Sequence, residues 1–306
     1  MSFKSSISRG AGRSAGRSAC ATFLIAITAG VMTAQDFSKI TVEKVANRFS
    51  FTEGPVWSRE GFLLFSDVPA DKILKLEPGE KPVIFREDTH GANGNTFDVQ
   101  GRLYSCESKS RRVIRTDKKG NVEVLAEKWQ GKRLNAPNDI VVRKDGHLYF
   151  TDPAFGSQAD GRELDFYGVY HIAPKGGMSL VAKPKGRPNG IAFSPNGRVL
   201  YVANSDDHNI RAYDVDKNGE TSNERVAVAG IEGVPDGIRT DEKGNIYVAA
   251  KGIAVYTSTG KLLHTIELAE TPANCAFGDA DFQTLYATAR TSVYRIRLDV
   301  KGSVQY

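Results

Sequence analysis

Polar and apolar positions along this chain repeat with a period of about 45 residues. Five stretches each begin with Glu, Asn or Asp, reach a Gly eight positions later and continue into a short apolar strand. They start at Glu53, Asn93, Asn138, Asn189 and Asp236, and their predicted strands are 62–66, 102–105, 147–151, 198–203 and 245–249. A sixth, degenerate copy starts at Asn274, has Phe282 in place of the Gly and continues into a strand at 284–289. The first polar residue of each copy is called its lead residue below.

The spacing of the copies predicts the fold. Successive lead residues are 40, 45, 51, 47 and 38 positions apart, and further predicted strands at 168–172, 178–182, 209–215 and 225–229 fit four strands per copy. Repeats of this length with several strands each are typical of β-propeller blades. The last copy ends before a fourth strand, so we expect 39–45 to complete it and cover an exposed edge. The sequence therefore predicts an all-β, six-bladed propeller over residues 37–306.

The first 34 residues differ from the rest. Four basic and no acidic residues accompany an apolar stretch from Cys20 to Val31, which is followed by small residues ending at Ala34. This order is typical of a secretory signal peptide, and the apolar stretch is shorter than a membrane span. We expect 1–34 to be cleaved and the mature protein to be secreted or periplasmic. An uncleaved anchor and a disordered tail are the alternatives.

Charge and cysteine content narrow the possible partners. The whole chain carries +5, of which residues 1–34 contribute +4, leaving about +1 for the mature chain. This balance predicts neither a nucleic-acid partner nor stable membrane insertion, and we expect a monomer. Cys106 and Cys275 are far apart in the sequence and lack the spacing of metal ligands, so they are interpreted as two buried thiols.

The lead residues are the candidate chemistry. Each is expected to precede the innermost strand of its blade, at 97–100 in the second copy and 140–143 in the third. Innermost strands line a propeller's channel, so equivalent residues should form one ring. The expected ring contains two carboxylates and four amides: Glu53, Asn93, Asn138, Asn189, Asp236 and Asn274.

Two carboxylates that converge in a dehydrated channel repel each other, and a divalent cation removes that repulsion. An all-oxygen set of low charge favours Ca²⁺, with Mg²⁺ or Mn²⁺ next. The lack of His and Cys makes Zn²⁺ the least favoured. The alternative is that Pro-Asn-Gly at 188–190 and Pro-Asp-Gly at 235–237 are ordinary turns.

At these residues the sequence resembles the gluconolactonase and senescence marker protein (regucalcin) family. The motifs are Glu53-Gly-Pro-Val-Trp57, Pro137-Asn-Asp139, Pro188-Asn-Gly190 and Pro235-Asp-Gly237. The bacterial gluconolactonase branch is the most similar, through 92–95, 134–139, 151–156 and 274–277. The resemblance implies a six-bladed propeller with a catalytic calcium that opens sugar lactones such as gluconolactone.

The resemblance also implies roles for individual residues. Glu53, Asn189 and Asp236 match the metal ligands of the family, Asn138 matches a fourth ligand or substrate contact, and Asp139 is expected to support them. Some members carry an Arg two residues before the Asn that matches Asn138. That position is Ala136 here. The candidate substrate contacts are therefore Asn93, Asn135, Arg133 and His90.

The chemistry of the expected reaction assigns two further roles. Lactone hydrolysis requires a general base to accept a proton from water, and Asp236 is the candidate, with Asn138 orienting the substrate. Two other functions remain open on the same ring. One is a phosphotriester or aryl-ester hydrolase, and the other is a non-catalytic ligand-binding propeller with structural calcium.

Overall fold

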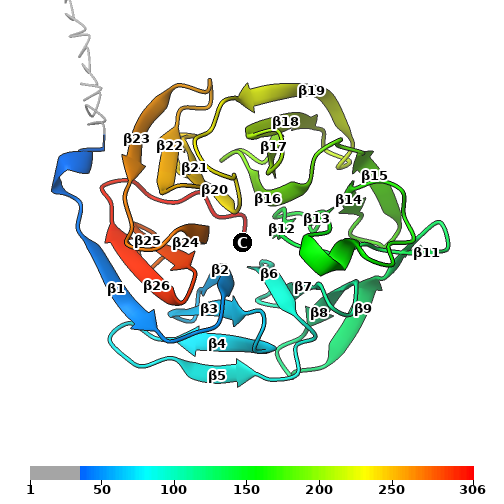
Figure 1. Cartoon of the computed structure of the whole chain (residues 1–306), viewed down its shortest axis with the longest axis horizontal. Coiled ribbons are helices and arrows are strands. Elements are labelled where there is room, and N and C mark those ends of the chain that lie inside the picture. Colours follow the sequence, from blue (N-terminus) through cyan, green and yellow to red (C-terminus); the bar gives the residue numbers. More distant parts are fainter. Residues whose placement is uncertain (1–34) are drawn as a thin grey trace, which may run out of the picture. The chain divides into compact units, whose positions relative to one another are not determined.

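Residues 35–306 contain six four-stranded sheets arranged around a central axis (Figure 1). The computed structural model describes residues 35–306, and the predicted signal peptide lies outside the described residues. Residues 35–306 form one compact unit. The prediction of an all-β, six-bladed propeller is confirmed. Among the described residues, no helix is long and apolar enough to cross a bilayer.

Neighbouring strands within each blade are antiparallel. Blade 1 contains β2 (Thr52–Ser58), β3 (Phe62–Asp67), β4 (Lys72–Leu76) and β5 (Val83–Arg86), and blade 2 contains β6 (Ala92–Phe97), β7 (Leu103–Glu107), β8 (Arg112–Thr116) and β9 (Val122–Ala126). Blade 3 contains β12 (Ile140–Val142), β13 (Leu148–Asp152), β14 (Gly168–Ile172) and β15 (Met178–Ala182), and blade 4 contains β16 (Pro188–Phe193), β17 (Val199–Asn204), β18 (Asn209–Val215) and β19 (Thr221–Val228). Blade 5 contains β20 (Ile238–Thr240), β21 (Ile246–Ala249), β22 (Ile253–Tyr256) and β23 (Leu262–Ile266). Blade 6 contains β24 (Pro272–Gly278), β25 (Thr284–Ala289) and β26 (Ser292–Arg297), and it is completed by β1 (Val42–Asn47). A small hairpin of β10 (Lys128–Trp129) and β11 (Lys132–Arg133), with the short 3₁₀ helices η1 (Phe37–Lys39) and η2 (Gly156–Ala159), lies outside the blades.

The last blade is closed by the first strand. β1 pairs with β26, with Val42 opposite Ile296 and Asn47 opposite Ser292. This strand was expected at 39–45, but it begins later because residues 37–39 form η1, where the Asp36 carboxylate accepts the Ser38 N–H at 3.1 Å. The closure itself follows the prediction, and it joins the two ends of the described chain through one sheet.

Four innermost strands are interrupted near their lead residues. The pairing register shifts in β2 after Glu53 and, at comparable places, in β6, β16 and β24. Such bulges bend a strand and re-aim its side chains. In blade 2 the inner strand was predicted at 97–100, but it spans Ala92–Phe97. The Asp98 carboxylate ends it by accepting the N–H groups of Gln100 and Arg102 in a turn.

Aromatic residues pack the blades against one another. Trp57 of blade 1 stacks on Tyr286 of blade 6 with ring centroids 5.5 Å apart, and Tyr149 of blade 3 meets the edge of Phe193 of blade 4 at 5.3 Å. All four rings are buried. Cys106 and Cys275 are both free and buried in the same layers, as predicted. This packing fixes the blades around the axis and therefore fixes the relative positions of the residues that line it.

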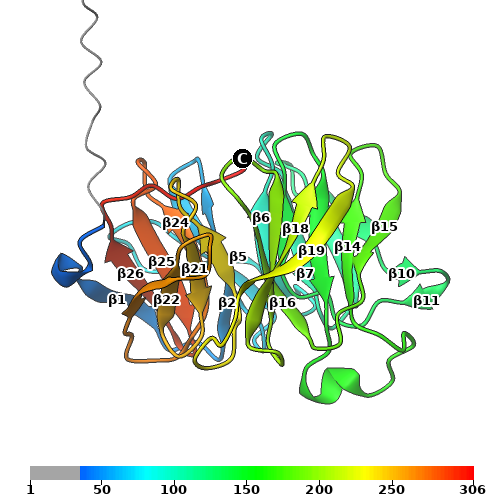
Figure 2. The same cartoon turned by 90° about the horizontal axis from the view of Figure 1, so that it is seen from above.

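The two faces of the propeller differ. Residues 303–306, called the closing segment, cross the axis on one face, where the label C stands at the centre of Figure 1. Ser303 N–H donates to Thr240 O at 2.8 Å, and Tyr306 Oη donates to Trp57 O at 2.7 Å. The long β13–β14 loop that carries η2, green in Figure 2, projects from the opposite face. A ligand that reaches the lead residues therefore has to enter from the face with the β13–β14 loop.

Candidate metal centre

Three lead residues from blades 1, 4 and 5 meet at the axis. The side chains of Glu53 and Asn189 both lie within hydrogen-bonding reach of the Asp236 carboxylate. Glu53 is 3% exposed and Asn189 is 4% exposed, whereas Asp236 is half-buried, so the meeting point is shielded on the side of Glu53 and Asn189 and keeps some access to water at Asp236. The chain thus brings two carboxylates and an amide from positions up to 183 residues apart to one point.

Glu53 is held in a fixed orientation. Its Oε2 accepts the Gly54 N–H at 2.7 Å and the Asn274 Nδ2–H at 3.1 Å. Burial, together with the nearby Asp139 carboxylate, raises the pKa of Glu53 to about 7. Burial and the carboxylates of Glu53 and Asp139 raise the pKa of Asp236 well above its usual range. Two carboxylates in this environment are costly to ionise without a positive partner.

Two amide oxygens of the lead residues lack partners. Asn93 Oδ1 and Asn189 Oδ1 are both buried without a hydrogen bond, although Asn189 Nδ2 donates to Ser205 Oγ at 3.1 Å. Buried polar atoms are nearly always satisfied, so unpartnered oxygens beside two carboxylates indicate a missing electropositive group. A hard divalent cation fits this donor set because it prefers carboxylate and amide oxygens.

The backbone brings the lead residues close by using glycine. Gly94 N–H donates to Asn138 O at 2.7 Å and Gly190 N–H donates to Asp236 O at 3.1 Å, which bonds blade 2 to blade 3 and blade 4 to blade 5. A Cβ on Gly190 would lie 2.3 Å from Asp236 O, and one on Gly54 would lie 1.8 Å from Asn93 O. Larger residues after these leads would push the ring apart.

The sixth lead residue is Ala273, and the prediction of Asn274 was wrong by one position. Gly237 N–H donates to Ala273 O at 2.8 Å, as Gly190 does to Asp236 O. Asn274 occupies the position after the lead, like Asp139 in blade 3, since each accepts the N–H of the following residue on its Oδ1 at 2.9 Å. The sixth blade therefore contributes Asn274 as a support for Glu53.

Asn138 lies at the same level of the channel, in blade 3. Its N–H donates to Thr151 O at 2.9 Å and its carbonyl accepts from Gly94, while the residue is 8% exposed. Its backbone is thereby fixed by its own blade and by blade 2. This position suits either a fourth metal ligand or a substrate contact, the two roles given to it above.

The other predicted substrate contacts lie further out. Arg133 is exposed on the β10–β11 hairpin and donates from Nη2 to Ser110 O at 3.0 Å. His90 is an exposed loop residue with φ +54°. Asn135 is 1% exposed and donates from Nδ2 to the carbonyl oxygens of Asp152 and Phe166. In residues 35–306 none of these three side chains is seen bonded to a lead residue.

The sequence reasoning did not select Asp152, which is buried, or Arg239, which is half-buried. Asp152 Oδ2 accepts the Asn135 N–H at 2.8 Å, and burial raises the pKa of Asp152 to about 7. It thus holds the loop that leads into Asn138. Arg239 Nη1 lies 3.4 Å from Asp139 Oδ2 inside the channel. In the sequence, Arg239 could have been noticed as a basic residue at a strand position where the other blades carry Val, Thr or Ala.

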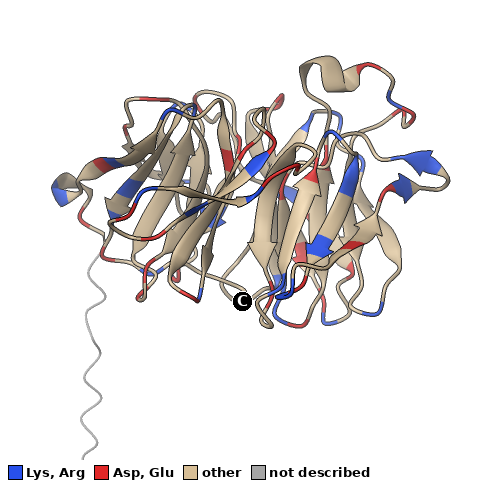
Figure 3. Cartoon of the chain, turned by 90° about the horizontal axis from the view of Figure 1, so that it is seen from below, with Lys and Arg blue, Asp and Glu red and all other residues tan. Residues whose placement is uncertain are grey.

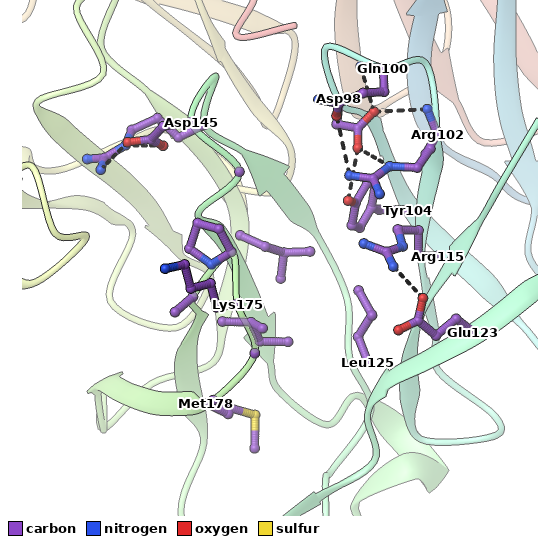
Figure 4. Close-up of a pocket in the computed structure, with 18 of the residues that line it drawn as sticks. Asp98, Gln100, Arg102, Tyr104, Arg115, Glu123, Leu125, Asp145, Lys175 and Met178 are labelled. Carbon is purple, nitrogen blue, oxygen red and sulfur yellow. Dashed lines mark hydrogen bonds and ion pairs between the residues drawn. The ribbon is translucent and has the colours of Figure 1, made fainter.

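A separate hollow of about 550 Å³ lies between blades 2 and 3 (Figure 4). Its charges are compensated locally, because Arg102 pairs with Asp98 at 2.6 Å and Arg115 pairs with Glu123. No lead residue lines it. Basic and acidic residues are intermixed over the blades and loops (Figure 3). Nowhere in residues 35–306, the axis included, are three His, Cys, Asp or Glu side chains arranged to hold a metal ion, so a cation at the axis would rely on two carboxylates together with amide oxygens. The candidate site is therefore the ring of carboxylates and amides at the axis.

Residues 51–291 match the family described as SMP-30/Gluconolactonase/LRE-like region. The chain belongs to this family. The gluconolactonase of Zymomonas mobilis is 32% identical over 293 residues, which covers 85% of this chain and 82% of that protein. The expectation of an enzyme of the gluconolactonase type is thus confirmed at the level of the family.

Solved structures of the family agree with the fold. A gluconolactonase of Xanthomonas campestris superposes with a TM-score of 0.79 at 31% identity, covering 85% of this chain and 89% of that one. A calcium-binding regucalcin of Agrobacterium tumefaciens gives a TM-score of 0.73 at 18% identity over 87% of this chain and 96% of its own, which supports the shared propeller alone.

Proposed function

We propose that this chain is a divalent-metal-dependent hydrolase, with calcium as its metal, that opens the ester bond of sugar lactones. One observation carries the proposal: Glu53, Asn189 and Asp236 converge at the axis with raised carboxylate pKa values and an unpartnered amide oxygen. Family membership points the same way, since the similar proteins of Zymomonas and Xanthomonas are named gluconolactonases. Calcium is proposed ahead of other divalent ions because the donor set consists of carboxylate and amide oxygens and carries a low charge.

Glu53, Asn189 and Asp236 would hold the cation, with Asn138 as a fourth ligand. When bound, a divalent cation polarises a carbonyl and stabilises the negative charge that develops on its oxygen. Glu53 is suited to be a ligand because Gly54 and Asn274 fix its Oε2. Asn189 is suited because its amide nitrogen donates to Ser205 and its oxygen is left free.

Asp236 would act as the general base. One of its oxygens can contact the metal while the other accepts a proton from the attacking water. The water oxygen bonds to the lactone carbonyl carbon, the ring C–O bond breaks, and the leaving alkoxide takes up a proton to give a hydroxy acid. Asn138 and Asn93 would orient the lactone by hydrogen bonds, as their placement at the axis allows.

Metal analysis of the purified protein, combined with lactone hydrolysis before and after chelation, tests the proposal. We expect one bound divalent ion per chain, loss of hydrolysis on chelation, and recovery with Ca²⁺ ahead of Mg²⁺ and Mn²⁺. A parallel panel of phosphotriesters and aryl esters serves as the control for substrate class. Hydrolysis of gluconolactone that survives complete metal removal would overturn the proposal, and faster turnover of phosphotriesters would reassign the substrate.

A further inference from the structure

The side chain of Arg239 lies in the channel beneath the ring of lead residues. Counting three residues past each lead gives a second layer of channel-lining positions. These positions are Val56, Thr96, Val141, Ala192, Arg239 and Ala276. Arg239 is the single charged residue among these six positions, and the other five are Val, Thr or Ala.

Arg239 is partly shielded from bulk water. Its side chain is 18% exposed, and Nη1 donates to Ile238 O at 2.6 Å and lies 3.4 Å from Asp139 Oδ2. It borders a cavity of about 50 Å³ that the closing segment (303–306) covers. A charge in a dry, narrow space acts more strongly on its neighbours than the same charge at the surface.

The Asp139 carboxylate bonds to residues of blades 3, 4 and 5, including Arg239 of blade 5. Its Oδ1 accepts the Ile140 N–H at 2.9 Å in blade 3, and its Oδ2 accepts the Ile191 N–H at 3.2 Å in blade 4. Arg239 joins it from blade 5. The three partners lie two or three residues beyond Asn138, Asn189 and Asp236 in the sequence. The Asp139–Arg239 pair therefore sits directly under three of the four proposed ligands.

A cation bound by the ring would face the carboxyl groups of Glu53, Asp139 and Asp236, and Arg239 is the basic side chain that lies among them. The positive charge of Arg239 repels a trivalent ion more strongly than a divalent one. We propose that Arg239 is a specificity-determining residue that sets the charge of the metal centre and selects a single divalent cation. This inference rests on the proposed metal-binding function of the ring.

Substitution of Arg239 separates its charge from its hydrogen bond. Arg239→Gln removes the charge but keeps a donor for Asp139, and Arg239→Lys keeps the charge. The Arg239 charge repels Tb³⁺ more than Ca²⁺, because Tb³⁺ carries one more positive charge. Removing the Arg239 charge therefore improves the affinity for Tb³⁺ more than that for Ca²⁺, by a factor on the order of ten in a partly dehydrated site. We expect the Tb³⁺/Ca²⁺ affinity ratio to rise about tenfold in Arg239→Gln and to stay near the wild-type value in Arg239→Lys. A role in positioning alone would weaken both ions by the same factor and leave the ratio unchanged.

Calorimetric titration with Ca²⁺ and terbium luminescence measure the two affinities without any assay of activity. Arg225→Met is the matched control, because Arg225 pairs with Asp214 on the outer strands of blade 4. Arg239→Met provides a second charge-removing variant if Arg239→Gln fails to fold. An unchanged affinity ratio in a folded charge-removing variant overturns the inference, and so does a second divalent ion in the wild-type channel. Wild-type protein that binds no divalent ion at all would instead overturn the proposed function.

Discussion

Replacing Glu53 with Gln should have opposite effects on stability with and without calcium. Burial raises the pKa of Glu53 from 4.5 to about 7 in the folded, metal-free protein. Gln has nearly the same shape, remains neutral, and can still accept the Gly54 N–H that Glu53 accepts at 2.7 Å. Its amide nitrogen can also donate to Asp236. The variant therefore removes an unfavourable buried charge from the metal-free state and a ligand from the metal-bound state.

The pKa shift of Glu53 sets the size of the stability difference. A rise of its pKa from 4.5 to about 7 corresponds to about 3 kcal/mol at 1.36 kcal/mol per pKa unit. Below pH 4.5 the carboxyl is protonated in both folded and unfolded states, so the penalty is absent. As the pH rises from 4.5 to 7 the unfolded chain loses its proton first, and the free energy of unfolding of the wild type falls. Above pH 7 the full penalty applies, and metal-free Glu53→Gln should be more stable than wild type by up to about 3 kcal/mol.

Urea unfolding of wild type and Glu53→Gln at pH 4 and pH 8, in chelator and in saturating Ca²⁺, measures the free energy of unfolding under each condition. At pH 8 the variant should be more stable than wild type in chelator and less stable in Ca²⁺, because a bound ion adds stability in proportion to the logarithm of its occupancy ratio. At pH 4 in chelator the two proteins should unfold together. A variant that is less stable than wild type in chelator at pH 8 would refute the reasoning, since Glu53 would then be stabilising without a cation.

Four further outcomes are expected. Asp236→Asn should lower lactone turnover by at least about a hundredfold while circular dichroism shows an intact fold; near wild-type hydrolysis would remove Asp236 from the role of base. Calcium affinity, measured by calorimetry, should weaken as the pH falls below about 7, because protons compete for Glu53, whose pKa burial raises to that value; equal affinity at pH 6 and pH 8 would contradict this. Gly190→Ala should destabilise the protein by about 3 kcal/mol in urea unfolding, because its Cβ would lie 2.3 Å from Asp236 O; wild-type stability would show that the ring can widen. Protein recovered from the periplasm or medium should begin after Ala34 by N-terminal sequencing, and an intact leader there would exclude cleavage.

The repeat made the fold readable because each blade carries the same turn and strand signals. The placement of Glu53, Asn189 and Asp236 around one axis followed from their register in the repeat. Blade 6 was misread by one residue because its lead is Ala273, and a neighbouring Asn resembles the polar leads of the other blades. The missing Gly before β25 removed the signal that would have corrected the register.

Arg239 could not be recognised in the same way. An Arg that alternates with apolar residues on a strand is usually read as facing solvent. Its placement depends on the closing segment and on Asp139, which lies 100 residues away and supplies its acidic partner. Arg133 and His90 were selected because they precede polar motifs in the sequence. Their backbones place Arg133 on the β10–β11 hairpin and His90 in an exposed loop, and their role as substrate contacts stays a prediction.

The pairing of β1 with β26 affects how the chain acquires its structure. Val42 and Ile296 are 254 residues apart in sequence, yet they are direct neighbours in the sheet. Contacts of such long range are slow to form, because a large loop must be closed before they contribute to stability. β1 therefore cannot pair until β26 has been synthesised. Until the two strands meet, the circle of blades stays open.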